Sequence, residues 1–422
     1  MNFEVIKRSH IKRNILISVV VVLVLSAIIL TFTRAKYRTT QSMPLLNGTI
    51  NYTLADLNIV AMYVDGEQVD TVPDGKYTLT SESYCTNEDN EKDESITISY
   101  DSETKGLSVS PMTKKGTKCY LYFVERLCPE GATACNTIMA ASRPQGQTTD
   151  WTNNGQGVTY YYTGADPNNW VQFGGFYWRI IRINGDGTIR MIYQGTSANT
   201  TGSGTQIGTS AFNSSYNNNM YVGFKYTSGQ VHGTGTNSTV LGASSSSSLN
   251  TWYQNNLADE AEYIDGNAGF CGDRTPSTSS SSSNGSGGTG TTKTYYGAYI
   301  RLVSNNNPSL QCSDSRDIYT TTDSSTGNKS LTYPIGLLTA DEYVLAGSGN
   351  SYLDVGTDYW TMSPYSFTSG GYAYVFTVAS YGLLGWYGVN PASGVRPVIN
   401  IRADVSISSG DGSASNPFVI AT

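Results

Sequence analysis

Apolar and polar positions alternate with a period of two over much of the chain, a pattern that predicts β-strands. The first such region spans about residues 50–124 and contains Asp65-Gly66, a dipeptide typical of tight hairpins. The second begins at residue 157, and in it Asn184-Gly185-Asp186-Gly187 separates two runs rich in β-branched and aromatic residues. We therefore expect a small β-sandwich stalk over 50–124 and a larger, β-rich domain over 157–422.

Two segments depart from this alternation and predict short helices. Leu249, Trp252, Tyr253 and Leu257 recur at helical spacing after a serine-rich stretch, giving one apolar face. In the second segment, Thr339 and Glu342 have capping-box spacing and Gly347 suits the C-terminal stop. The expected fold class is α+β, with short helices around a β-rich core. The Ser/Gly-rich residues 276–292 are expected to form a flexible insertion.

The N-terminal region predicts a membrane anchor. Residues 15–32 carry no charge, and 18 residues at about 1.5 Å each nearly cross a bilayer core of about 30 Å. We assign 1–13 to a cytoplasmic tail, 14–33 to the anchor, 34–49 to a linker and 125–156 to a second linker or small helical piece. A cleaved signal peptide is the alternative, although its usual Ala-x-Ala exit is absent.

All six cysteines lie beyond this anchor, as expected for disulfides in an oxidising compartment. Proximity within the expected domains favours the pairs Cys85–Cys119, Cys128–Cys135 and Cys271–Cys312. Zinc is a weaker alternative, because no Cys-x-x-Cys occurs and no histidine neighbours a cysteine.

Charge and histidine content exclude several classes of function. The net charge is -7 at pH 7, so no basic field attracts a nucleic acid. The chain has two histidines, His10 before the apolar segment and His232 in a Gly/Thr-rich loop, so a catalytic triad could use only His232. We expect no cofactor and no metal.

Residues 359–395 contain no charged residue but are rich in Tyr, Trp, Ser, Gly and Asn. Antibody binding loops use the same mixture, with rigid rings for contact area and small polar groups for hydrogen bonds. The alternative is that these rings form the inner face of a sheet. We expect Trp360 to belong to the core and the cluster as a whole to be a binding surface.

Several charged residues are candidates for a chemical role. The acid pairs Asp341/Glu342, Asp354/Asp358 and Asp314/Asp317 are candidates for glycosidase chemistry, but sequence adjacency does not give the required separation across a sugar. Asp186 and Asp411 lie in Gly-Asp-Gly turns, which lack the dense oxygen ligands of a calcium loop. Arg396 could pair with a buried carboxylate and fix the last strand, or it could line the site, and we expect the structural pairing.

The chain also resembles a known group of proteins. The motifs Trp178-Arg179-Ile180, Leu249-Asn250-Thr251-Trp252-Tyr253, Trp360-Thr361-Met362-Ser363-Pro364 and Gly394-Val395-Arg396-Pro397-Val398 resemble those of membrane-anchored surface proteins of gut Firmicutes. Their C-terminal domain is similar to the C-type-lectin fold in its formylglycine-generating-enzyme-like branch. The resemblance covers about 157–422 and implies structural roles for Trp178, Trp252, Trp360 and Arg396.

Within that branch, the variable proteins of diversity-generating retroelements display changing residues near the C-terminus. The resemblance implies that the displayed, ligand-binding positions are Tyr365, Ser366, Thr368, Tyr372, Tyr374, Tyr381, Trp386, Tyr387 and Asn390. The reactive cysteine pair of the oxidase members is missing, since no cysteine follows Cys312, and so is the calcium triplet of sugar-binding lectins. Both departures favour binding without redox or metal chemistry.

The sequence therefore predicts a single-pass cell-surface protein with an extracellular C-terminal domain. It is expected to bind a protein or carbohydrate ligand outside the cell, without catalysis, and homo-oligomers would add avidity. Two alternatives stay open: an extracellular hydrolase acting on glycans through Asp and Glu, and an inert structural component of the envelope.

Overall fold

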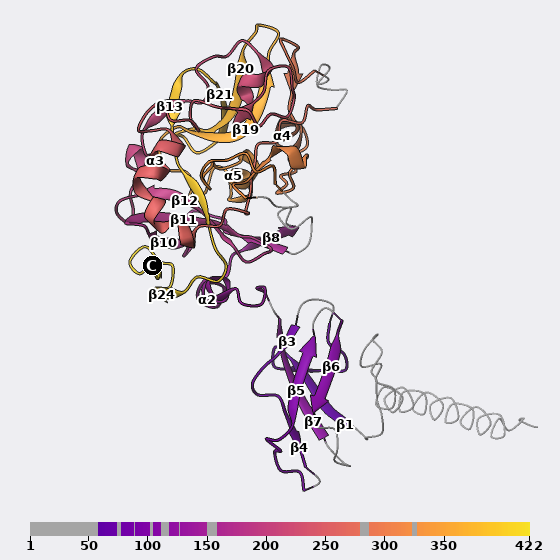
Figure 1. Cartoon of the computed structure of the whole chain (residues 1–422). Coiled ribbons are helices and arrows are strands. Elements are labelled where there is room, and N and C mark those ends of the chain that lie inside the picture. Colours follow the sequence, from indigo (N-terminus) through magenta and orange to yellow (C-terminus); the bar gives the residue numbers. More distant parts are fainter. Residues whose placement is uncertain are drawn as a thin grey trace, which may run out of the picture. The chain divides into compact units, whose positions relative to one another are not determined.

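The computed structural model describes residues 58–73, 77–87, 89–101, 104–110, 118–125, 127–149, 158–278, 287–322 and 327–422. The tail, the membrane anchor predicted over 14–33 and the linker 34–49 lie outside these residues. Among the helices described, none has the length and apolar character needed to cross a bilayer. The chain divides into two compact units, which meet in sequence between Leu127 and Cys128 (Figure 1).

In the first unit, the described residues form a five-stranded sheet and a two-stranded sheet. In the larger sheet, β7 pairs with β1 in parallel and with β3 and β4 in antiparallel fashion. Asp65 (φ 50°) and Gly66 (φ 85°) form the predicted turn between β1 and β2. The strands are β1 (Asn58–Val64), β2 (Glu67–Val69), β3 (Tyr77–Leu79), β4 (Tyr84–Thr86), β5 (Thr97–Asp101), β6 (Gly106–Ser110) and β7 (Lys118–Glu125).

The two sheets of this unit share one apolar core. Met62, Leu121 and Phe123 of the larger sheet are buried together with Val109 of β6. Tyr100 of β5 meets Phe123 edge to face, with ring centroids 4.9 Å apart. The apolar face that alternates along β5 and β6 therefore packs against the larger sheet.

The second unit contains an eight-stranded sheet with the order β23-β12-β11-β10-β25-β24, in which β9 pairs with β11 and β8 with β9. The predicted hairpin around Asn184 and Gly187 joins β11 to β12. These two strands are buried almost throughout, so they form the centre of the unit. The strands are β8 (Gly146–Thr149), β9 (Val158–Tyr161), β10 (Trp170–Phe173), β11 (Phe176–Ile183), β12 (Ile189–Gly195), β23 (Val398–Ile401), β24 (Ile407–Ser409) and β25 (Phe418–Ile420).

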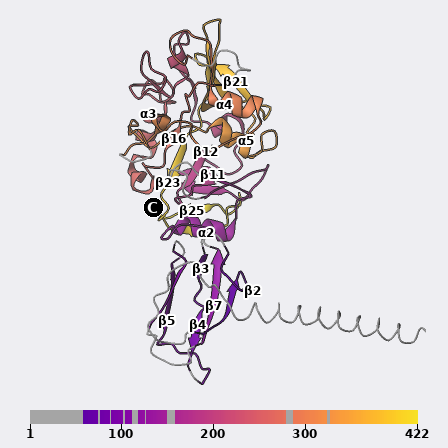
Figure 2. The ribbon, with the colours of Figure 1, turned by 90° about the vertical axis from the view of Figure 1, so that its right-hand side faces the viewer.

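A six-stranded sheet, with the order β13-β22-β19-β20-β21 and with β17 paired to β19, forms the other large layer of this unit. In Figure 1 its labelled strands lie above β10 and β11, and in Figure 2 β21 lies above β11. Its strands are β13 (Thr209–Ala211), β17 (Thr294–Tyr295), β19 (Tyr359–Phe367), β20 (Ala373–Val378), β21 (Leu384–Gly388) and β22 (Ala392–Gly394). The architecture is thus α+β and β-rich.

The helix α5 (Ala340–Leu345) connects the two large sheets. It begins at the predicted capping box, in which Thr339 and Glu342 each bond the backbone of the other, and Gly347 (φ 97°) follows its end. Its first backbone N–H donates to the Ser363 hydroxyl of β19, at 3.0 Å. On its other side, Glu342 lies 3.0 Å from Arg182 of β11 and 2.5 Å from Arg190 of β12.

The other helices are short. α3 (Leu249–Asn256) forms at the predicted place, with Trp252 and Tyr253 buried, and continues as a 3-10 turn over Ala258–Tyr263. α2 (Thr133–Ala141) and β8 fall within the region predicted to be a linker or small helical piece, and residues from Cys128 onward belong to the second unit.

All three disulfides pair as proximity predicts: Cys85–Cys119, Cys128–Cys135 and Cys271–Cys312. Within the Ser/Gly-rich insertion, residues 279–286 lie outside the described part of the chain. Its second half is held by Asn219, whose amide donates to the carbonyls of Thr289, Gly290 and Thr292. That half is therefore anchored to the fold.

Arg396 is buried, but its partner differs from the prediction. The guanidinium donates to the Tyr193 carbonyl at 3.1 Å and to the Gln194 side-chain oxygen at 2.6 Å, and it lies over the Tyr359 ring at 4.7 Å. Burial lowers its pKa, since neutral groups and an aromatic face replace the expected carboxylate. Its structural role holds, because it joins β12 to the segment before β23.

Candidate ligand-binding site

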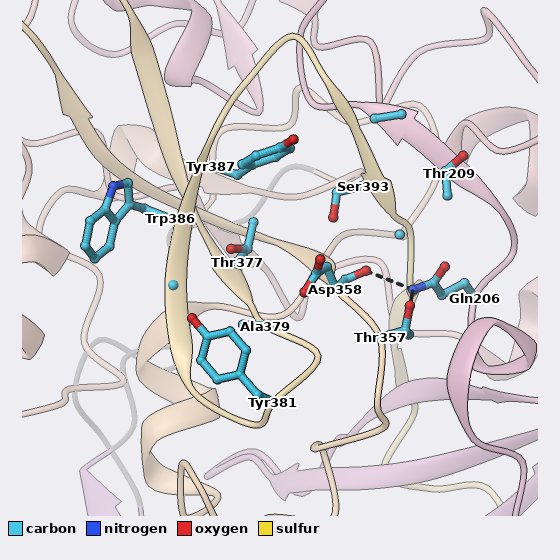
Figure 3. A pocket seen from close by; sticks show the side chains of 13 residues that line it. Gln206, Thr209, Thr357, Asp358, Thr377, Ala379, Tyr381, Trp386, Tyr387 and Ser393 are labelled. Atoms are coloured by element: carbon cyan, nitrogen blue, oxygen red, sulfur yellow. Dashed lines mark hydrogen bonds between the residues drawn. The ribbon is translucent and has the colours of Figure 1, made fainter.

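The six-stranded sheet carries a pocket of about 510 Å³ on the face where β20, β21 and β22 meet the segment before β13 (Figure 3). Its walls combine aromatic rings with amide, hydroxyl and carboxylate groups. The lining residues are Gln206, Thr209, Thr357, Asp358, Thr377, Ala379, Tyr381, Gly385, Trp386, Tyr387, Ala392, Ser393 and Gly394. Convergent polar groups beside exposed rings are the usual composition of a small-ligand site.

Hydrogen bonds within the fold hold the polar wall of this pocket. The Gln206 amide donates to the Asp358 carbonyl at 2.9 Å and to the Thr357 hydroxyl at 3.2 Å. The Asp358 carboxylate in turn accepts from the Ser380 backbone N–H at 2.7 Å. Gly394 is required beside Gln206, because a Cβ at that position would collide with the Gln206 amide. The wall is thus preorganised before a ligand arrives.

The aromatic residues are divided between the two faces of the sheet. Successive residues of a strand point to opposite faces, so Trp386 and Tyr387 leave β21 on opposite sides (Figure 3). Tyr387 lies on the pocket side, with its ring centroid 6.1 Å from that of Trp360. Trp386 points the other way and stacks on Tyr365, with centroids 4.8 Å apart and planes within 4°, although it also borders the pocket at its rim. The two neighbouring rings of β21 therefore differ in the side chains that they contact.

The residues predicted to be displayed differ in their exposure to solvent. Four rings are strongly exposed: Tyr381 (73%), Trp386 (55%), Tyr387 (47%) and Tyr372 (43%). Tyr365, Thr368 and Tyr374 are half-buried, and Asn390 is exposed. Ser366 is buried at 1%, so its hydroxyl does not reach the surface.

Three of the displayed rings, Tyr381, Trp386 and Tyr387, are strongly exposed and border the pocket. Tyr372 lies elsewhere, stacked on Tyr216 at 4.6 Å.

The structural tryptophans lie where sequence analysis places them. Trp178 and Trp360 are fully buried, and Trp252 is 8% exposed. The Trp178 and Trp252 rings meet at 6.2 Å and pack around Tyr193. The Trp360 indole donates to the Ser210 carbonyl at 2.8 Å, which ties β19 to β13 beneath the pocket.

Sequence reasoning missed the polar wall. Gln206 and Thr209 lie about 150 residues before Asp358, and they approach it because β13 pairs with β22, which leads back to β19. No local motif marks them. The sequence marks Asp358 only as half of a carboxylate pair, and it marks Thr377 and Ser393 only by their place in an uncharged stretch.

Two of the acid pairs weighed for hydrolysis are engaged in the fold. Asp341 accepts from Arg301 at 2.9 Å, and burial raises its pKa although Arg301 opposes the shift. Burial alone would raise the pKa of Glu342, but Arg190 and Arg182 hold it below the ordinary value. Asp354 accepts from the Tyr343 hydroxyl at 2.6 Å. Of these acids, only Asp358 lies in the pocket.

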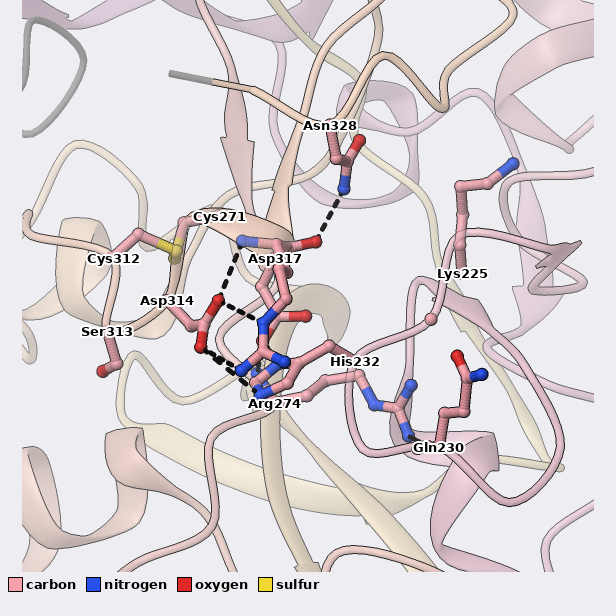
Figure 4. Close-up of polar contacts among 12 residues, drawn as sticks. Lys225, Gln230, His232, Cys271, Arg274, Cys312, Ser313, Asp314, Asp317 and Asn328 are labelled. Carbon is pink, nitrogen blue, oxygen red and sulfur yellow. Dashed lines mark hydrogen bonds and ion pairs between the residues drawn. A yellow bond between two sulfur atoms is a disulfide. The ribbon is translucent and has the colours of Figure 1, made fainter. Parts of the chain in front are cut away.

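His232 has acids on both sides (Figure 4). Its Nδ1 lies 2.8 Å from Asp317 and its Nε2 lies 3.6 Å from Asp314. A hydrogen bond from Arg316 lowers the pKa of Asp314 to about 2. Because both ring nitrogens face carboxylates, neither is directed at a nucleophile, and the cysteines drawn beside them, Cys271 and Cys312, are joined to each other.

The described residues hold no group of three or more His, Cys, Asp or Glu side chains arranged to bind a metal ion. Asp186 and Asp411 both accept hydrogen bonds within their own turns, from Thr188 and Ser413 respectively. Comparison with protein-family models, with curated proteins and with solved structures found no match.

Proposed function

We propose that this protein is anchored in the cell membrane by residues 14–33 and binds a protein or carbohydrate ligand outside the cell through the pocket on its six-stranded sheet. Binding is not followed by chemical change of the ligand. The observation that carries the proposal is the meeting of Tyr381 and Tyr387, both strongly exposed, with the fixed polar groups of Asp358 and Gln206 in one 510 Å³ pocket. Rings of this kind supply contact area, and the amide and carboxylate orient the ligand.

The remaining features support recognition over turnover. Hydrolysis of a glycan requires two acids flanking one bond, and the pocket contains a single carboxylate, Asp358. An inert envelope component has no need to expose several large rings, since exposed apolar groups that are gathered together usually mark an interaction surface. The three disulfides support an oxidising, extracytoplasmic location.

The finer fold assignment is part of the same proposal. The first unit fits a β-sandwich stalk, and the second fits a C-type-lectin-like domain of the formylglycine-generating-enzyme-like branch. In a diversity-generating retroelement, a template repeat near a reverse-transcriptase gene would align with the codons for 359–395. Mismatches confined to template adenines would support diversification of this region; an absent template, or mismatches at all four bases, would contradict it.

Glycan and protein arrays, probed with the full chain in detergent micelles, test the binding proposal. We expect Tyr387→Ala to lower the affinity for any ligand found by about tenfold or more, because the ligand loses its contact with the Tyr387 ring. Val303→Ala is the matched control, since Val303 is 51% exposed but does not line the pocket. Equal binding by the wild type, Tyr387→Ala and Val303→Ala would contradict a role for the pocket.

A further inference from the structure

The strand β21 is an edge strand of the six-stranded sheet. Among the described residues, β20 is the one strand that pairs with it, and the sheet order ends there. The pairing of β20 with β21 runs without a register shift from Tyr374↔Gly388 to Val378↔Leu384. One edge of β21 therefore makes backbone hydrogen bonds with β20, and its other edge is directed away from β20.

Two hydrogen bonds just beyond this ladder reveal which residues point away from β20. The Ala379 N–H donates to the Leu383 carbonyl at 2.9 Å, and at the other end the Val389 N–H donates to the Ala373 carbonyl at 3.1 Å. In an antiparallel ladder, hydrogen-bonded pairs alternate with non-bonded pairs. Counting inward from both ends gives the same answer: Leu384, Trp386 and Gly388 direct their N–H and C=O groups outward.

This edge lacks the usual devices that prevent strand addition. Natural edge strands carry a charge, a proline or a bulge that blocks pairing with another chain. Leu384–Gly388 reads LGWYG and contains no charged residue and no proline, and no bulge interrupts its pairing with β20. Trp386 and Tyr387 within the strand, and Leu383 just before it, are exposed. An open, apolar edge of this kind favours a strand partner.

The sequence of β21 is complementary to itself when two copies run antiparallel about Trp386. In that register Leu384 lies opposite Gly388 of the second strand, and Tyr387 lies opposite Gly385, so each large side chain covers a glycine. The two Trp386 residues face each other at the dyad, where their outward N–H and C=O groups can bond reciprocally. With no charged side chain in the strand, the pairing brings no like charges together.

We propose that two copies of this chain associate through β21, forming one continuous antiparallel sheet with a twofold axis beside Trp386. A second copy satisfies both requirements of the edge, which are backbone partners for three outward residues and small residues opposite the large ones. The axis of such a pair is perpendicular to the sheet. The two Tyr387-lined pockets therefore open on the same side of the joined sheet, an arrangement that would strengthen attachment to a repetitive ligand by avidity.

The first test removes one outward donor without breaking the sheet. Trp386→Pro removes the indole and also the backbone N–H that points away from β20, and an edge strand tolerates proline at such a position. Trp386→Val removes the indole but keeps the N–H, so the comparison of the two variants isolates the effect of the N–H. Light scattering of the full chain in detergent micelles, over a dilution series, should give twice the chain mass for the wild type. We expect the dissociation constant of Trp386→Pro to be about tenfold or more higher than that of Trp386→Val.

The second test places a cysteine at the dyad. Facing Cα atoms of a hydrogen-bonded antiparallel pair are about 5.5 Å apart, within the range of a disulfide. Full-length Trp386→Cys should thus form a covalent dimer on mild oxidation, whereas Tyr381→Cys, although its position is more exposed at 73%, should not. A monomeric wild type, equal cross-linking of the two cysteine variants, or equal dimerisation of the Pro and Val variants would each overturn the proposal. None of these results depends on the ligand of the pocket.

Discussion

The Trp386 indole lies parallel to the Tyr365 ring, with centroids 4.8 Å apart. Tyr365 also meets Tyr299 at 5.2 Å and Phe376 at 5.0 Å, so the indole extends a row of packed rings. Its neighbour Tyr387 takes no part in this row. Trp386 and Tyr387 therefore have different contacts although they are neighbours in one strand, and substitutions of the two residues should have different effects on stability.

We expect Trp386→Ala to lower the free energy of unfolding of the second unit by about 1 kcal/mol, because an offset or parallel ring pair contributes about 0.5–1.5 kcal/mol. Tyr387→Ala should cost less stability, since its ring lies 6.1 Å from Trp360 in a tilted contact. Urea titration followed by tryptophan fluorescence measures both. Tyr365→Leu supplies the control: on that background, Trp386→Ala should lose most of its effect. A full effect there would mean that the stacking is not the cause.

Glu342 is expected to be the most sensitive buried charge of the unit. It lies between Arg182 and Arg190 and also completes the capping box of α5 by accepting from the Thr339 N–H. Glu342→Gln would leave two buried guanidinium groups without their counter-charge, which costs about 3–5 kcal/mol. Thr339→Ala removes only the cap and should cost about 1 kcal/mol. Thermal unfolding of the two variants compares them, and equal losses would contradict a role for the charge.

The same glutamate predicts a dependence on pH. The pKa of Glu342 is lower in the folded state than its ordinary value of 4.5, because the two arginines outweigh burial. A depressed pKa contributes stability that is fully present above the unfolded value and is lost as the pH falls through the folded one. The melting-temperature gap between the wild type and Glu342→Gln should therefore be constant near pH 7 and should narrow below about pH 4.5. A gap that stays constant in acid would be inconsistent with this account.

Local signals in the sequence were enough to predict a large part of the fold. Asp65-Gly66 and Asn184-Gly185-Asp186-Gly187 determine their hairpins through backbone preferences, and Thr339 with Glu342 marks the start of α5. The disulfide pairs could also be predicted from the sequence, because each pair joins cysteines of one predicted region of the chain. These features depend on residues that are close in the sequence.

The site could be predicted only in part, since its polar wall is built by distant segments. Gln206 reaches Asp358 through the pairing of β13 with β22, and no local pattern encodes that pairing. Arg396 shows the same limit: its burial was foreseen, but its partners on β12 depend on packing. That Trp386 and Tyr387 point to opposite sides follows from the period-two rule once β21 is known to be a strand, but the bounds of that strand are not marked within the aromatic stretch.

The disulfides of the second unit should differ in the stability that they contribute. Cys271 and Cys312 are 41 residues apart in sequence, and Cys128 and Cys135 are 7 apart. A longer closed loop restricts the unfolded chain more, so the loop-entropy relation gives about 4 kcal/mol for the first bond and about 2 kcal/mol for the second. Urea unfolding of the two double Cys→Ser variants measures the losses. We expect the Cys271→Ser/Cys312→Ser variant to unfold at the lower urea concentration. The reverse order would mean that local packing around Cys128 and Cys135, and not loop length, determines what these bonds contribute.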